Sequence, residues 1–132
     1  MRALYNSIAD LNRGCANSNT YCTVVYNKIA HDICKLLLRN GLIYSFMFST
    51  NNKGKTIIKV YYKYIQDRRL VYRIRRVSYP GGRCYWTVDA LKRKLAQDKN
   101  VWVLSTSHGL LTMKEALSHN TGGEVLFKIN HL

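Results

Sequence analysis

The chain has 132 residues, which is long enough for one globular domain or for two small ones. Hydrophobic residues make up 47% of it, with one Pro and eight Gly, and this composition excludes disorder over most of the length. The 21 Lys and Arg outnumber the 7 Asp and Glu and give a net charge of +14, so we expect an anionic partner.

The sequence carries no membrane or metal signal. Apolar runs such as residues 41–50 are too short to span a bilayer, and we expect no secretory signal peptide. The cysteines show neither a Cys-x-x-Cys pair nor a Cys/His ligand spacing, so we expect no zinc site and no other cofactor. We predict four reduced, partly buried thiols: Cys15, Cys22, Cys34 and Cys84.

The first 41 residues predict a helix, a strand and a second helix. Apolar side chains recur at helical spacing over residues 3–16, which predicts an amphipathic helix. Residues 21–26 are rich in β-branched and aromatic types and predict a strand. Asn27 suits the N-cap of the second helix, and Gly41 suits its left-handed C-terminal cap.

A hairpin is predicted next, with strands over residues 42–49 and 55–64 around the turn at 51–54. Side chains of a strand alternate between its two faces. One face of the second strand should therefore join the core, and the other should carry lysines interleaved with Tyr61. The turn at 66–68 is our candidate domain boundary.

The remaining elements follow from turn, capping and alternation signals. They are a strand over 70–77, a break at 79–82, extended chain over 83–86, a helix over 87–95 capped by Thr87, a strand over 101–104, a helix from the capping box of Thr112 and Glu115 to about 119, and a strand over 125–129.

The positive charge is concentrated in the middle of the chain. Residues 1–52 carry a net +3, residues 53–99 carry +11, and residues 100–132 are neutral. We expect the middle segment to meet phosphates, which makes affinity depend steeply on salt. If the last segment binds an anion, it must do so by hydrogen bonding and shape.

The predicted loop at residues 105–109 combines small hydroxyl side chains with a glycine. Small residues let a backbone approach nucleic acid closely, and hydroxyls can form hydrogen bonds with phosphate, ribose and base edges. Those hydroxyls could instead only satisfy the loop. A catalytic serine is disfavoured, because the Gly-x-Ser-x-Gly elbow is absent and no spacing ties His108 to a carboxylate. Glu124 can accept a base amino group or a ribose hydroxyl, or orient the serine loop, or simply be solvated at the start of a strand. We expect Gly122 and Gly123 to form the tight turn before it.

Residues 103–126, which read VLSTSHGLLTMKEALSHNTGGEVL, resemble the C-terminal signature of a universal ribosomal family, the eighth protein of the small subunit. Two further segments match in the right order: Ile8-Ala9-Asp10 with Leu11 and Arg13, and Arg75-Arg76-Val77-Ser78-Tyr79-Pro80-Gly81 with Arg83 and Tyr85. The sequence departs from the family pattern at Gly82, at residues 97–100 and at His108, where Lys or Arg is frequent.

The resemblance implies an α+β fold of two small α/β domains, each with a short, mostly antiparallel sheet and one or two helices. We place them at residues 1–65 and 66–132. It also implies a structural, non-enzymatic protein that binds a helical region in the central domain of small-subunit rRNA, supports its assembly and contacts neighbouring ribosomal proteins. No membrane or small-molecule partner is expected. The predicted RNA-contacting residues are Ser105, Thr106, Ser107, Gly109, Gly122, Gly123, Glu124, Tyr85, Arg83, Arg76, Ser78, Pro80, Arg75, Arg73, Lys55 and Lys59.

Other functions remain open from the sequence. They are a free RNA-binding regulator that uses the same surface, a small Cys/His hydrolase, and a peripheral membrane protein, which the absence of a basic amphipathic helix disfavours. Eleven Asn, eleven Lys and ten Tyr with only two Glu are typical of AT-rich genomes. We therefore expect a ribosome of organelles, mitochondria in the first place, with the bacterial cytoplasm as the alternative.

Overall fold

The computed structural model describes residues 2–16, 21–66 and 68–131. They form two compact units, Met1–Ile74 with His131–Leu132, and Arg75–Asn130. Both combine helices with antiparallel strands, which confirms the expected α+β class. The domain boundary expected after residue 65 stays a prediction, because compact packing does not show which parts of the chain fold independently.

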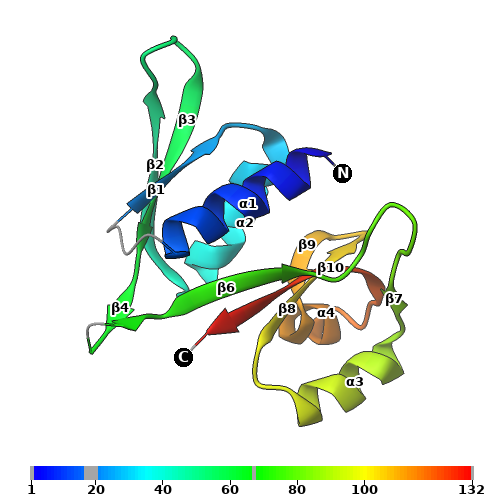
Figure 1. Ribbon diagram of the computed structural model, residues 1–132. Helices are drawn as coiled ribbons and strands as arrows, with labels where there is room; N and C mark the ends of the chain where they lie inside the picture. The colour runs from blue at the N-terminus through cyan, green and yellow to red at the C-terminus, as the bar shows by residue number, and fades with distance from the viewer. Residues whose placement is uncertain (1, 17–20, 67, 132) are drawn as a thin grey trace. The chain divides into compact units, whose positions relative to one another are not determined.

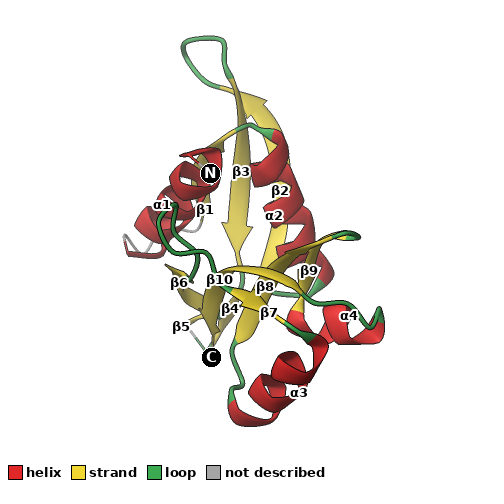
Figure 2. Cartoon of the chain, turned by 90° about the vertical axis from the view of Figure 1, so that its right-hand side faces the viewer, coloured by secondary structure: helices red, strands yellow, loops and turns green. Residues whose placement is uncertain are grey.

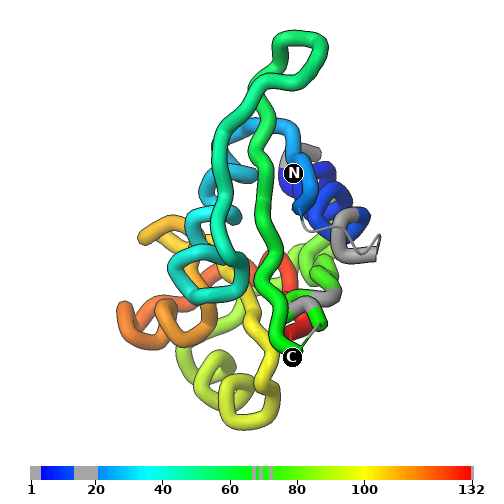
Figure 3. The backbone as a smooth tube through the Cα atoms, turned by 90° about the vertical axis from the view of Figure 1, so that its left-hand side faces the viewer, coloured from blue at the N-terminus to red at the C-terminus, as the bar shows by residue number. Residues whose placement is uncertain are grey.

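The first unit packs two helices on a three-stranded antiparallel sheet of order β1-β3-β2 (Figure 1). Its main elements are α1 (Arg2–Ala16), β1 (Tyr21–Val25), α2 (Lys28–Arg39), β2 (Ile43–Thr50) and β3 (Thr56–Tyr62). All five were predicted within a few residues. The tube in Figure 3 follows the long hairpin of β2 and β3 through its loop.

Both predicted caps of α2 are present. The Asn27 side chain accepts from the amide of Ala30 at 2.8 Å, so it satisfies an amide at the start of the helix. At the other end Gly41 adopts a φ of +70°, and Leu42 donates back to the carbonyl of Leu37 at 2.9 Å. This is the hydrogen-bond pattern of a Schellman motif, which favours glycine at the left-handed position.

β3 shows the predicted alternation. Ile58, Val60 and Tyr62 are buried, whereas Lys59 and Tyr61 are half-buried on the opposite face. The Tyr62 hydroxyl donates to the carbonyl of Leu11 in α1 at 3.1 Å, which satisfies its polar end inside the core.

After β3 come the short strands β4 (Tyr64–Ile65) and β5 (Arg68–Arg69), which pair as a hairpin, and then β6 (Val71–Arg76). Of the predicted turn at 66–68, Gln66 has a φ of +51° and residue 67 lies outside the described residues. Within the first unit, Asn12 of α1 forms two hydrogen bonds with Ile74 of β6. The Asn12 side chain accepts from Ile74 N–H at 2.8 Å and donates to Ile74 C=O at 2.7 Å.

The second unit is built on a sheet in which β10, β8 and β9 pair in that order, with β7 paired to β10. Its elements are β7 (Tyr85–Trp86), α3 (Val88–Gln97), β8 (Val101–Thr106), β9 (Gly109–Thr112), α4 (Met113–Ser118) and β10 (Gly123–His131). Figure 2 shows α3 and α4 next to each other. The predicted N-cap Thr87 and the capping box of Thr112 and Glu115 are both formed.

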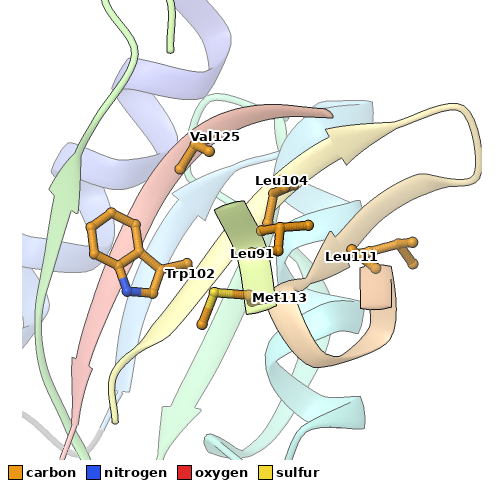
Figure 4. Close-up of a cluster of buried hydrophobic side chains, with 7 residues drawn as sticks. Leu91, Trp102, Leu104, Leu111, Met113 and Val125 are labelled. Carbon is orange, nitrogen blue, oxygen red and sulfur yellow. The ribbon is translucent and has the colours of Figure 1, made fainter. Parts of the chain in front are cut away.

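One face of this sheet packs under the two helices. The cluster drawn in Figure 4 combines buried side chains from both layers: Leu91 of α3, Met113 and Ala116 of α4, and Trp102, Leu104, Leu111 and Val125 of the strands. Because neighbours along a strand point to opposite faces, this core fixes which residues of β8, β9 and β10 face the other way.

Cys34 and Cys84 are free thiols, Cys22 is buried, and the side chain of Cys15 lies outside the described residues. Burial, with a smaller contribution from the nearby Cys22, raises the pKa of the Cys34 thiol to about 12. Because the thiolate is the reactive form, Cys34 is chemically inert near neutral pH.

Candidate nucleic-acid interface

Strand register places four residues in one row across the second unit. Glu124 of β10 pairs with Tyr85 of β7 on one side and with Ser105 of β8 on the other, and Ser105 pairs in turn with Leu110 of β9. The residues that precede or follow them in the strands, such as Leu104, belong to the core under the helices. The row therefore lies on the opposite face.

Three residues of the row carry groups that can bind a polar ligand: the ring of Tyr85, the carboxylate of Glu124 and the hydroxyl of Ser105. Tyr85 is 65% exposed and Ser105 is exposed, whereas only 12% of the Glu124 side chain is accessible. Arg83 Nη1 lies 3.9 Å from Glu124 Oε2. A carboxylate held beside a guanidinium can accept hydrogen bonds from RNA without presenting a bare negative charge to phosphates. Sequence reasoning missed this ion pair because the two residues are far apart in the chain.

The serine segment forms a tight hairpin end and not the loop that we expected. Ser105 and Thr106 belong to β8, and the two-residue turn of Ser107 and His108 leads into β9. The Thr106 hydroxyl donates to the carbonyl of Gly109 at 2.9 Å and accepts from the His108 amide at 3.1 Å. These bonds fix the exposed Ser107, and Gly109 has a φ of +96°.

The expected turn at Gly122 and Gly123 is wrong. Neither glycine has a positive φ, and the left-handed residue after α4 is Asn120 at +51°. The glycines are needed for close approach instead: a Cβ at Gly122 would lie 2.4 Å from the carbonyl oxygen of Trp86, and one at Gly123 would lie 2.4 Å from that of Ser105. They bring β10 against its neighbours and so place Glu124 in the row.

Ser78 differs from the other predicted contact residues because it is buried, with 1% exposed. Its hydroxyl donates to the carbonyl of Val125 and accepts from the Cys84 amide at 3.0 Å. Ser78 therefore holds the turn at 79–82 against β10, and we assign it a positioning role. Pro80 is exposed in that turn.

Basic side chains of the second unit lie around this turn. The guanidinium of Arg76 sits over the ring of Tyr79, 4.4 Å from its centroid, and Arg75 is exposed. Arg76 Nε and Nη2 are buried, so this stacking presents mainly the exposed ring of Tyr79 to a ligand.

Three predicted basic contacts, Lys55, Lys59 and Arg73, belong to the first unit. Lys55 and Arg73 are exposed. Lys59 is half-buried, with its ammonium 5.5 Å from the ring centroid of Tyr21. The structure thus groups the row and the 75–85 segment in the second unit and places these three cations in the first.

In the described part of the chain, no group of three or more His, Cys, Asp or Glu could hold a metal ion. None of the described helices is long and apolar enough to cross a membrane.

Comparison with known proteins indicates the same family as the signature at residues 103–126. A family model described as Ribosomal protein S8 matches residues 3–130. The small ribosomal subunit protein uS8 of Chlorobaculum tepidum is 40% identical over 130 residues, which cover 94% of this chain and 96% of the relative. The uS8 protein of Geobacillus stearothermophilus is 33% identical over 123 residues, covering 90% and 92%. The chain therefore belongs to the ribosomal protein S8 family.

Proposed function

We propose that this protein is a structural constituent of the small ribosomal subunit that binds a helical region in the central domain of small-subunit rRNA and supports assembly of that region. The family match over residues 3–130 carries this conclusion. Its partners are small-subunit rRNA and neighbouring ribosomal proteins. Members of the family are not enzymes, which agrees with the expectation for this chain.

We further propose that the row of Tyr85, Glu124 and Ser105, extended by Thr106, Ser107 and Gly109, makes the specific RNA contact. The support is chemical. An exposed tyrosine stacks on an unpaired base, which is worth about 1–3 kcal/mol per base. A carboxylate and hydroxyls within one row offer acceptors and donors to base edges and to the ribose 2′-OH.

Cations of both units supply general affinity. Arg75, Arg76 and Arg83 lie near the row in the chain, and Lys55, Lys59 and Arg73 add charge from the first unit. Each neutralised phosphate releases counterions, so these contacts strengthen binding to any RNA and weaken with salt.

The test is binding of the purified full chain to its own small-subunit rRNA transcribed in vitro, with chemical footprinting of the RNA. We expect protection confined to one helical region of the central domain, and co-sedimentation of the protein with small subunits at high salt. Protection spread evenly over the RNA would contradict the proposal. A pool that never sediments with subunits would favour the free RNA-binding regulator.

We also propose that this ribosome is mitochondrial. The support is the composition, with eleven Asn, eleven Lys and only two Glu, as in products of AT-rich genomes. The relatives named above are bacterial, and a bacterial cytoplasmic ribosome is the alternative. Mass spectrometry of ribosomes from purified mitochondria and from whole-cell extracts of the source organism separates the two.

A further inference from the structure

One edge of the sheet in the first unit is open and uncharged. β2 stands last in the strand order β1-β3-β2, so among the described strands only β3 pairs with it. Residues 41–52 contain no Asp, Glu, Lys, Arg or Pro, although the whole chain carries a net charge of +14. The large side chains of β2 are exposed, with 74% of Tyr44 and 50% of both Met47 and Phe48 accessible. Sheet edges are usually protected by charges or proline, and β2 has neither.

A hydrogen bond at the hairpin loop shows which backbone groups of β2 point away from β3. The amide of Asn51 donates to the carbonyl of Lys55 at 2.9 Å. Hydrogen-bonded positions recur at every second residue of an antiparallel pair, so from residue 45 on the odd-numbered residues of β2 bond to β3. The even-numbered residues direct their amides and carbonyls to the open edge. These residues are Phe46, Phe48 and Thr50.

Two of these residues also belong to an aromatic cluster beside the edge. The ring centroids of Phe46 and Phe48 lie 6.2 Å apart, and the ring of His31 in α2 lies 5.1 Å from that of Phe48. Tyr26 completes the aromatic cluster, with its ring 5.7 Å from Phe48. Residues opposite each other in a sheet lie on the same face, so a strand added at this edge would place every second side chain against these rings.

The charges that flank the edge are all positive. No Asp or Glu occurs from residue 33 to residue 66. Lys53 and Lys55 are exposed in the loop after β2, which projects beyond the helices of the first unit (Figure 3). Before the other end of β2, Lys63 Nζ lies 3.4 Å from the carbonyl oxygen of Gly41. Carboxylates at both ends of a bound segment would therefore meet lysines. RNA would also meet these cations, but it would leave the amides and carbonyls of the edge without regular partners.

We propose that the β2 edge binds an extended segment of a second protein, which adds to the sheet as a fourth strand and carries apolar side chains at alternate positions and carboxylates at its ends. Main-chain hydrogen bonds supply the affinity, and the aromatic cluster selects the side chains. The inference rests on the proposed function, because a constituent of the small subunit has protein neighbours. It concerns a surface other than the row of Tyr85, Glu124 and Ser105.

The probe is the synthetic peptide Glu-Glu-Val-Thr-Val-Thr-Val-Glu-Glu, added to the isotopically labelled full chain, with amide exchange followed by NMR. In the free chain, the amides of Phe46, Phe48 and Thr50 should exchange faster than those of Met47 and Ser49. Saturating peptide should slow exchange at the first three at least about tenfold. A control peptide with N-methylated valines cannot donate to the edge and should give no protection.

Variants of the chain test the aromatic cluster. Phe48→Ala removes one ring but keeps the backbone groups, and it should weaken peptide binding at least about fivefold. Tyr64→Ala removes an exposed ring of β4 outside the aromatic cluster and should bind the peptide as the unmodified chain does. The NMR spectrum of each variant shows whether it is folded. A peptide with Gln in place of Glu should bind more weakly and with less salt dependence.

Three results would overturn the inference. They are no protection of the even-numbered amides at about 1 mM peptide, equal protection by the N-methylated peptide, and protection of the same amides by small-subunit rRNA alone, which would assign the edge to RNA. The proposed function is tested by the rRNA footprint, in which the peptide takes no part. The two can therefore fail independently.

Discussion

Gly123 marks the point where the main chains of β10 and β8 lie too close for a side chain. A Cβ there would lie 2.4 Å from the carbonyl oxygen of Ser105, a backbone atom that cannot swing away. We predict that Gly123→Ala lowers the free energy of unfolding by about 1–3 kcal/mol, the usual cost of overpacking. Urea denaturation followed by circular dichroism measures the loss.

Gly81 provides the matched control. It has no positive φ, and a Cβ there would meet nothing within 4 Å. Gly81→Ala should therefore leave the urea midpoint within error of the original. Equal midpoints for both variants would show that β10 can shift to accommodate a methyl group, contrary to the close-approach explanation.

Asp98 contributes a pH dependence to stability. Its carboxylate accepts from the Asn100 amide at 2.9 Å and from Trp102 Nε1 at 3.1 Å, and lies 3.3 Å from Lys128 Nζ. The bond from Asn100 is the largest of the causes that hold its pKa below the ordinary 3.8. The resulting stabilisation is present above the unfolded-state pKa and is lost as the pH falls through the lower folded-state value.

We therefore predict that Asp98→Asn lowers the urea midpoint at neutral pH and that this deficit shrinks on acidification below about pH 3.8. Asp32→Asn removes the exposed pair with Lys35, whose charged atoms lie 3.8 Å apart, and should cost less than about 1 kcal/mol. A deficit for Asp98→Asn that stays constant with pH would contradict this account.

At the scale of elements, one side chain of α1 helps to hold β6 at Ile74. Asn12 satisfies both the amide and the carbonyl of Ile74, as a paired strand would. Ile74 is only 3% exposed, so water cannot readily replace these bonds. We predict that Asn12→Ala destabilises the protein by about 1–3 kcal/mol, the cost of leaving buried polar groups unsatisfied.

Amide hydrogen exchange checks the mechanism. Exchange at Ile74 should accelerate in Asn12→Ala, while the amide of Leu42, which closes the Schellman motif of α2, should keep its protection. Uniform acceleration of both amides would indicate global destabilisation without a local effect on β6.

Elements with local signals were predictable from the sequence. Asn27, Gly41, Thr87 and Thr112 mark helix ends because capping depends on a few neighbouring residues. β9 was missed because the Ser107-His108 turn lacks the Asn-Gly type of dipeptide that usually indicates a two-residue hairpin.

The sequence names candidate residues for the site but does not give their arrangement. The family signature pointed to Ser105 and Glu124, yet their pairing with Tyr85 in one row depends on strand register between distant segments. The burial of Ser78 and the steric role of Gly123 are likewise tertiary effects. The periodicity of a single segment predicts neither the register between distant strands nor these tertiary effects.

At the scale of the whole molecule, the uneven distribution of charge along the chain predicts two kinds of RNA-binding defect among variants. Ser107→Ala and Glu124→Ala should weaken binding to the specific rRNA helix with little change in salt dependence, since each lost hydrogen bond to RNA costs about 1–3 kcal/mol. Arg75→Ala and Lys59→Ala should weaken binding to any RNA and flatten the logarithmic salt slope by about one unit per lost contact.

Binding isotherms at several salt concentrations, on the specific helix and on an unrelated duplex, measure both effects. Lys92→Ala serves as the control, because Lys92 is an exposed cation of α3 outside the proposed contact set. Identical salt slopes and identical losses for all four variants would contradict the division between specific and general contacts.

The placement of the indole rings has a practical consequence. The chain has two tryptophans, Trp86 and Trp102, and both lie in the second unit with ring centroids 5.0 Å apart. Emission excited selectively from tryptophan therefore reports on that unit alone. Trp86 directly follows Tyr85 and pairs with Gly123, so nucleotides that dock on the row alter its surroundings. The protein thus carries a built-in, label-free optical reporter at the very strand through which we expect it to recognise its RNA.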